Sequence, residues 1–192
     1  MTRWLALALL VPAAAWAQPK GDPDWPCPQR LVPVVSAAAL WPEAGEGDWR
    51  AEPDVATLVG RIAPRAVEER EGVAAIEGFA APLGVDRRRR LLPLAFAGAL
   101  EETNAQRGQV IEQIRRFARH QRELAGRVRG LEAELRAAPP EAREELEQRH
   151  AFAAKTYTEA ERTLRYACEV PVRLEARLGA YARALRAALP PE

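Results

Sequence analysis

The chain has few of the residues that enzymes use as nucleophiles or metal ligands. It contains two cysteines, two histidines and one serine, Ser36, which has no nucleophile-elbow sequence around it. No glycine-rich phosphate-binding loop occurs. His120 and His150 are predicted to lie roughly 10 Å apart, and no further ligands complete a metal site around them. We therefore expect no catalytic residues, no cofactor and no metal.

Charge of one sign and long hydrophobic runs are also missing. The net charge is +1 at pH 7, so no overall field favours nucleic acid or an anionic membrane. After the N-terminus the best apolar run, Leu91 to Leu100, has about half the length that a transmembrane helix needs. It is predicted to be a helix segment buried on all sides. We expect no nucleic acid partner and no transmembrane segment in the mature chain.

Residues 1–17 have the pattern of a secretory signal peptide. Arg3 supplies the positive start, Trp4 to Ala15 form a short apolar core, and Ala15-Trp16-Ala17 is a small-x-small cleavage site. Cleavage after Ala17 would leave Gln18 as the N-terminus; the alternatives are an uncleaved anchor and a buried N-terminal helix. An Arg-rich, Lys-poor and Ala-rich composition is typical of a GC-rich bacterial genome, so the predicted location is the periplasm.

The two cysteines are candidates for one disulfide if the chain is exported. A bridge between Cys27 and Cys168 would close a loop of roughly 140 residues, worth about 5 kcal/mol in the chain-entropy model. The alternatives are a buried thiol at Cys168 and an intermolecular bond through Cys27. No C-x-x-C pair points to a dithiol oxidoreductase, and no C-x-x-C-H sequence allows c-type haem attachment.

Residues 18–53 are predicted to form an extended N-terminal arm. The segment is rich in Pro, Trp and Gly, and its prolines exclude a long helix. Its tryptophans, Trp25, Trp41 and Trp49, need apolar surface to bury against. Residues 31–35 have the pattern of a short strand, although no partner strand is apparent, and residues 36–41 that of a short helix with Ser36 as its N-cap.

One stretch of the arm resembles a family-specific sequence motif. Asp24-Trp25-Pro26-Cys27, continuing through Val32-Pro33 to Leu40-Trp41, resembles the start of uncharacterised exported proteobacterial proteins. The resemblance covers roughly the first third of the mature chain, and that group carries no activity to transfer. Trp25 and Trp41 are therefore either a binding epitope or pins that hold the arm on the helices, and the second interpretation is favoured.

Residues 54–192 are predicted to form a helical bundle with a long hairpin. Two short helices, 54–62 and 66–80, precede two long ones, 86–137 and 141–188, which are joined by a turn near residues 138–140. Apolar residues follow a heptad pattern along both long helices. The predicted fold is all-α: a long antiparallel helical hairpin with a coiled-coil stalk, two short helices at its base and the extended arm. The seam consists of Val110, Ile114, Phe117, Gln121, Leu124, Val128, Leu131 and Leu135 on the first long helix, and Leu146, His150, Ala153, Tyr157, Ala160, Leu164, Ala167, Pro171, Leu174, Leu178, Tyr181, Leu185 and Ala188 on the second.

Counting outward from the turn predicts which seam residues meet. Ile114 should meet Leu164, and Phe117 should meet Ala160, which would give large-against-small packing. Gln121 should lie opposite Tyr157 and share a hydrogen bond with it. The arginine-rich stretch 107–129 would face the glutamate-rich stretch 141–161, which favours the antiparallel hairpin.

Arg87, Arg88, Arg89 and Arg90 form a run of four cations at the start of a predicted helix. Cations at this end oppose the helix dipole. One interpretation is a site for phosphate, acidic lipid or an acidic partner. The other, which is favoured, is a solvated collar whose charge neighbouring carboxylates partly compensate.

Together these features predict an exported, periplasmic helical-hairpin interaction protein without catalytic activity. It would act as an adaptor, a scaffold or a chaperone-like factor for protein partners in the cell envelope, and self-association through the stalk is a further expectation. The alternative is a redox-linked or ligand-sensing protein in which the Cys27–Cys168 disulfide opens and closes. An enzyme with a pocket between arm and bundle is the least favoured hypothesis.

Overall fold

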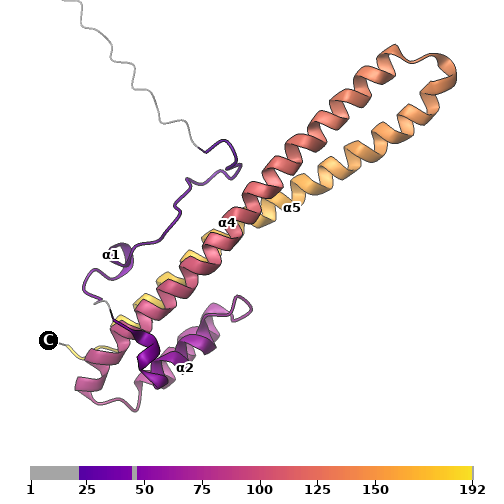
Figure 1. Ribbon diagram of the computed structural model, residues 1–192. Coiled ribbons are helices and arrows are strands. Elements are labelled where there is room, and N and C mark those ends of the chain that lie inside the picture. The colour runs from indigo at the N-terminus through magenta and orange to yellow at the C-terminus, as the bar shows by residue number, and fades with distance from the viewer. Residues whose placement is uncertain (1–21, 45–46, 192) are drawn as a thin grey trace, which may run out of the picture.

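A computed structural model describes residues 22–44 and 47–191 of the protein (Figure 1). In these ranges there are helices and no strand, so the predicted all-α helical hairpin is confirmed. The predicted signal peptide and its cleavage site near Ala17 lie outside the described residues. The elements in chain order are α1 (Ala37–Leu40), the 3-10 helix η1 (Trp49–Ala51), α2 (Pro53–Ile62), α3 (Glu69–Ala80), α4 (Val85–Ala137) and α5 (Pro140–Ala187).

The two long helices, α4 and α5, contain 53 and 48 residues and run antiparallel along the whole molecule (Figure 1). Pro140 occupies the first turn of α5, where its missing N–H costs nothing. Gly84 occupies the N-cap position of α4, and Asp86 lies in its first turn, where its negative charge is favourable. Pro93 and Pro171 lie inside the helices without ending them.

The predicted seam is buried or half-buried along both long helices, with one exception. Ile114 and Leu164 belong to one buried cluster, as predicted. Phe117 is the exception: it was predicted to be buried in the seam, but it is 45% exposed, whereas its neighbour Ala118 is 3% exposed. The N-terminal arm covers the side of α4 that carries Ala118, which buries this residue. Phe117 lies on the side of α4 that the arm does not cover.

The main core lies at the base of the hairpin, where α2 and α3 pack on α4 and α5. Phe96 and Leu178 are fully buried there with apolar residues of both short helices. Close approach of the helices requires glycine at two positions. A Cβ on Gly98 would lie 2.7 Å from Val59, and one on Gly72 would lie 2.0 Å from the Tyr181 hydroxyl oxygen. Burial raises the pKa of Tyr181.

The loop between α2 and α3 is held on the hairpin by two polar side chains. Arg177 is buried and donates to the carbonyl oxygens of Ala63, Pro64 and Val67 at 2.8–3.0 Å. Gln106 on α4 donates to the same Ala63 carbonyl at 2.9 Å. These carbonyls follow the last turn of α2 and need donors from outside the helix. The α2–α3 pair therefore covers one flank of the hairpin, and only near its base.

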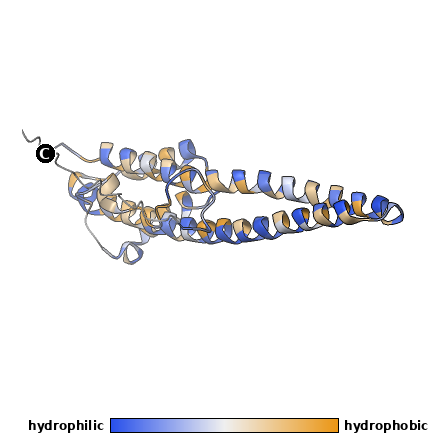
Figure 2. Cartoon of the chain, turned by 90° about the horizontal axis from the view of Figure 1, so that it is seen from above, coloured by the Kyte–Doolittle hydropathy of each residue, from blue (hydrophilic) through white to orange (hydrophobic). Residues whose placement is uncertain are grey.

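Beyond the base the hairpin is two helices thick. Figure 2 shows hydrophobic residues gathered around the base and hydrophilic ones along the distal part of the hairpin. Among the described residues, no helix combines the length and the apolar character needed to cross a bilayer.

Candidate interaction surface

The predicted disulfide is confirmed and fixes the N-terminal arm to the middle of α5. The Cα atoms of Cys27 and Cys168 lie 5.5 Å apart, and both residues are buried. Gln29 adds a hydrogen bond from its amide nitrogen to the Cys168 carbonyl oxygen at 2.6 Å. The arm therefore crosses the hairpin at a defined height, joined to α5 by a covalent and a polar contact.

The first described residues of the arm bind the arginines of α4. Asp22 pairs with Arg115 at 2.7 Å, and Asp24 pairs with Arg119 at 2.8 Å and with Arg122. The pKa of Asp22 lies below its ordinary value, first because the Asp24 backbone N–H donates to its carboxylate and then because Arg115 does. The pKa of Asp24 is lowered by the donors of Arg119 and Arg122. Arginines of the basic stretch of α4, which was expected to face the acidic stretch of α5, thus form ion pairs with the arm.

Two polar residues of α4 hold the backbone of the arm further along. The Asn104 side chain accepts from the Val35 backbone N–H and donates to the Val35 carbonyl oxygen, both at 2.9 Å. Arg107 is buried and donates to the Val32 carbonyl oxygen at 3.0 Å. Sequence reasoning missed these roles. The available signal was a pair of polar residues interrupting an apolar seam, since a buried polar side chain needs a partner.

Both predicted tryptophan pins lie against the chain itself. Trp25 donates its indole N–H to the Gln29 carbonyl oxygen at 2.8 Å and packs beside the disulfide cluster. Trp41 is 3% exposed, and its ring centroid lies 5.4 Å from that of Phe96 in the base core. Within the described structure these two indoles anchor the arm instead of facing outward as a pair.

Three of the four arginines in the 87–90 run have partners inside the molecule. Arg87 pairs with Asp54 at 2.9 Å, and Arg90 pairs with Glu52, so both tie α4 to the start of α2. Arg88 donates to backbone carbonyls that follow the ends of α3 and α5. Arg89 is exposed. These contacts offset the unfavourable position of the cations at a helix start, and they do not bring the four guanidinium groups together around one point.

The exposed aromatic side chains of the hairpin lie on the flank opposite the arm. Phe117 lies two positions from both Arg115 and Arg119, which bind the arm, and helix positions two apart point in nearly opposite directions. Tyr166 has the same relation to Cys168, and it is 63% exposed. Phe152 precedes Tyr166 by two heptads and therefore shares its face of α5. Figure 1 shows the arm and the α2–α3 pair on opposite sides of the hairpin.

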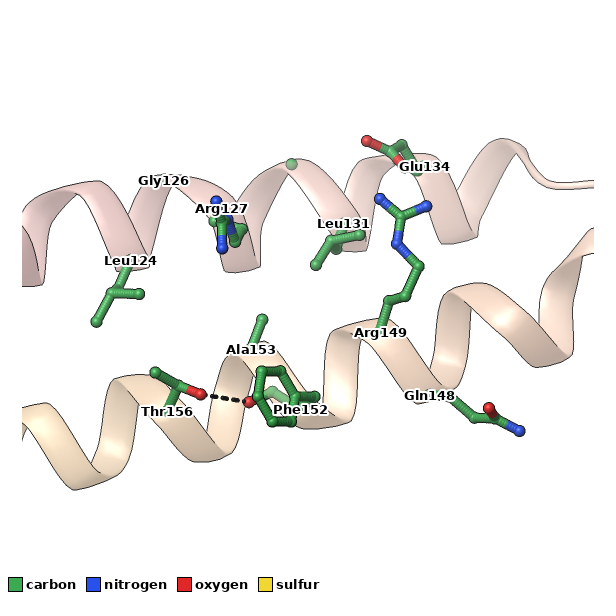
Figure 3. Close-up of a pocket in the computed structure, with 11 residues that line it drawn as sticks. Leu124, Gly126, Arg127, Leu131, Glu134, Gln148, Arg149, Phe152, Ala153 and Thr156 are labelled. Atoms are coloured by element: carbon green, nitrogen blue, oxygen red, sulfur yellow. Dashed lines mark hydrogen bonds between the residues drawn. The ribbon is translucent and has the colours of Figure 1, made fainter.

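A groove of about 730 Å³ opens between the distal parts of α4 and α5 on this same flank (Figure 3). In Figure 3 Leu124 and Leu131 point from α4 toward α5, and Ala153 points back. Phe152 borders the groove with 73% of its surface exposed. Gly126 and Gly130 carry no side chain on the α4 side of the groove, and the space at their Cβ positions is open, with no atom within 4 Å. We call this surface, defined by Phe117, Gly126, Arg127, Gly130, Phe152, Thr156 and Tyr166, the open flank.

The open flank continues the surface that α2 and α3 cover at the base. Gln106 and Arg177, which hold the α2–α3 loop, precede Arg127 and follow Thr156 by three heptads each. Residues separated by whole heptads share one side of a coiled coil. The same flank is therefore covered at the base and uncovered toward the tip in the described structure.

Neither histidine belongs to a metal site in the part of the chain that the structure describes, where no cluster of three or more His, Cys, Asp or Glu side chains is placed to hold an ion. His120 and His150 each lie 3.5 Å from one carboxylate oxygen, of Glu123 and Glu132 respectively. The hydrogen bond expected between Gln121 and Tyr157 is not formed: Gln121 Oε1 is buried and has no hydrogen-bond partner.

Comparison with known proteins adds no further constraint on function. No protein-family model matches the chain, and no curated protein or solved structure is significantly similar to it.

Proposed function

We propose that the protein is an exported, periplasmic helical-hairpin interaction protein without catalytic activity, acting as an adaptor, a scaffold or a chaperone-like factor for protein partners in the cell envelope. One observation carries this proposal: the distal hairpin is two helices thick and carries exposed aromatic side chains on one flank, whereas its base is covered. An exposed aromatic side chain beside a groove, as Phe152 is here, offers the kind of anchor on which another protein docks.

The placement of the ionisable groups supports a binding role over a catalytic one. Groups with a shifted pKa mark catalytic sites when they converge in a cleft. Here the shifted acids Asp22, Asp24 and Glu101 all face arginines in ion pairs that hold the arm or η1 on α4. Tyr181, whose pKa is raised by burial, lies in the base core. Their shifts have a structural explanation, and none of these groups borders the open flank.

The disulfide supports export, because such bonds persist in oxidising compartments and are rare in the cytosol. Its burial favours a structural role over the alternative of a redox switch. Asn104, Arg107 and Arg115 hold the same arm without the disulfide. Reduction alone would therefore leave most contacts of the arm in place.

Photo-crosslinking in cells tests the proposal. A crosslinking amino acid at Arg129 or at Ala142 samples the stalk and its tip, and the same substitution at the exposed Arg70 of α3 is the matched control on the base. We expect crosslinks to other envelope proteins from the two stalk positions and none from Arg70. One discrete band indicates an adaptor or scaffold, and many bands indicate a chaperone-like factor.

The same cells provide the test of export. Mass spectrometry of the periplasmic fraction should find the chain beginning at Gln18. A chain that stays in the cytosol, or that gives no stalk crosslink to any protein, contradicts the proposal.

A further inference from the structure

We propose that the open flank binds the open flank of a second copy of this chain, and that the two hairpins run in opposite directions about a two-fold axis at the height of Phe152. The two bases then lie at opposite ends of the dimer. The inference uses only the hairpin itself, so it does not depend on the compartment or on any other partner.

The base of the molecule indicates what kind of element covers this flank. There α2 and α3, an antiparallel helix pair, lie on the same side of the hairpin and form a four-helix bundle with α4 and α5. The distal hairpin is itself an antiparallel helix pair. A second copy therefore supplies the element that the flank accepts at its base.

The length of the uncovered surface selects the opposite orientation of the two copies. The α2–α3 loop reaches Gln106 on α4, and the open flank extends from about residue 110 to the end of the helix at Ala137, roughly 40 Å at 1.5 Å per residue. Two hairpins with their bases together would bring both α2–α3 pairs into the same space. With the bases apart, the tip of each hairpin ends beside the α2–α3 loop of the other.

Side-chain sizes match across this arrangement. Phe152 and Gly126 border the same groove, so the axis brings Phe152 against the second copy's Phe152 and lets the two α4 helices approach at glycine. Phe117 lies nine residues from Gly126, so equal counts from the axis place it near the second copy's Leu135 and Ala133. Tyr166, fourteen residues from Phe152, reaches the turn at the second copy's Ala138 and Pro139. Each exposed aromatic residue of the flank therefore lies near an aromatic, an aliphatic or a proline side chain.

The charges on α4 are also self-complementary in this orientation. Antiparallel contact of α4 with its copy brings Arg127 beside the second copy's Glu123, and Arg116 within a turn of the second copy's Glu134. Two-fold symmetry repeats both pairs. These α4 pairs favour this register over a shifted one, whereas equal counts on α5 place Arg149 near the second copy's Lys155, a like-charged pair that offsets part of this effect.

The area of the flank is sufficient for a stable dimer. About 40 Å of two helices, each about 10 Å across, gives roughly 800 Å² per copy, which is the size of a standard protein interface. The contact centres on Phe152, and aromatic residues at the centre of an interface contribute most of its binding energy.

Sedimentation velocity of the purified, disulfide-bonded protein at tens of micromolar concentration tests the dimer. We expect a dimer for the wild type and an increase of at least about 100-fold in its Kd for Phe152→Glu, which places a carboxylate at the centre of both copies. The matched control is Thr158→Glu, another exposed position of α5, on the flank that carries the arm, and it should leave the Kd unchanged. A wild-type monomer overturns the proposal, as does a dimer that Phe152→Glu leaves intact.

Engineered disulfides test the orientation. Phe152→Cys lies at the axis and should give a covalent dimer on mild oxidation. Tyr166→Cys lies two heptads from the axis, so the two copies of this residue are about 40 Å apart and should not link. Equal linking by both variants means parallel hairpins and overturns the proposal. If the wild type is monomeric while Arg129 and Ala142 still crosslink to other envelope proteins, the dimer is rejected and the proposed function stands.

Discussion

The base and the distal part of the hairpin are built on the same heptad seam but differ in what covers it. At the base, Phe96 and Leu178 are fully buried because α2, α3 and the arm add layers to α4 and α5. In the distal part, Leu124 and Leu131 are buried by the opposite helix alone, and Phe152 next to them is exposed. A seam is therefore enough to pair two helices, and additional layers decide where the hairpin has a core and where it has a surface.

The largest expected effect concerns the disulfide, which lies between the two regions. The double variant Cys27→Ser/Cys168→Ser should lower the free energy of unfolding by up to about 5 kcal/mol, because the bond closes a loop of 141 residues. Guanidinium unfolding of the oxidised wild type and the variant measures the difference. A loss below about 1 kcal/mol, the size of an ordinary surface change such as Val34→Ser, would contradict a structural role for the bond.

Core truncation compares the two regions directly. Phe96→Ala in the base should cost about 4 kcal/mol, because it leaves a cavity among fully buried neighbours. Leu131→Ala in the distal seam should cost about 2 kcal/mol, at the low end for its type, because the site borders an open groove into which solvent enters. Denaturant unfolding of both variants gives the two losses. Equal losses would mean that the distal seam is as tightly packed as the base.

A pair of glycine substitutions on α4 distinguishes covered from uncovered helix surface. Gly98→Ala should destabilise the protein by about 2 kcal/mol, since its Cβ would meet Val59 and Trp49. Gly108→Ala has no atom within 4 Å of its Cβ and should stabilise the protein by about 1 kcal/mol through helix propensity. Thermal unfolding should therefore shift in opposite directions. A stabilising Gly98→Ala would show that α2 does not press on α4 at this point.

The smallest effect is the response of the arm to acid. Because the pKa values of Asp22 and Asp24 in the folded protein lie below 3.8, their ion pairs contribute fully above that pH and are lost as the pH falls through the lower folded values. The indole N–H resonance of Trp25 should shift in this range, while that of Trp41 in the base should not. In Asp24→Asn the shift should be smaller. Equal shifts of both indoles would indicate unfolding of the whole molecule.

The seam beneath the open flank could be predicted from the sequence, whereas the residues of the flank itself could not. The heptad pattern placed Leu124, Leu131 and Ala153 in one seam, and the structure buries all three. It also placed Phe117 there, because a strict heptad count continues the seam through position 117 regardless of what packs on the other sides of the helix. The arm decides between Phe117 and Ala118 by covering one side of α4, and no local pattern encodes which side an arm will take.

By itself, the sequence determined the all-α hairpin, its turn, its seam and the cysteine pair, because these depend on periodicity, on proline and on which residues need burial. Only the tertiary structure decided that Asn104, Arg107 and Arg177 hold backbone carbonyls or amides of distant segments, that the arm and the α2–α3 pair take opposite sides, and that Phe117, Phe152 and Tyr166 share the open flank. The physical reason is that each of these depends on contacts between residues far apart in the chain, whereas periodicity reports only which face of a single helix a residue occupies.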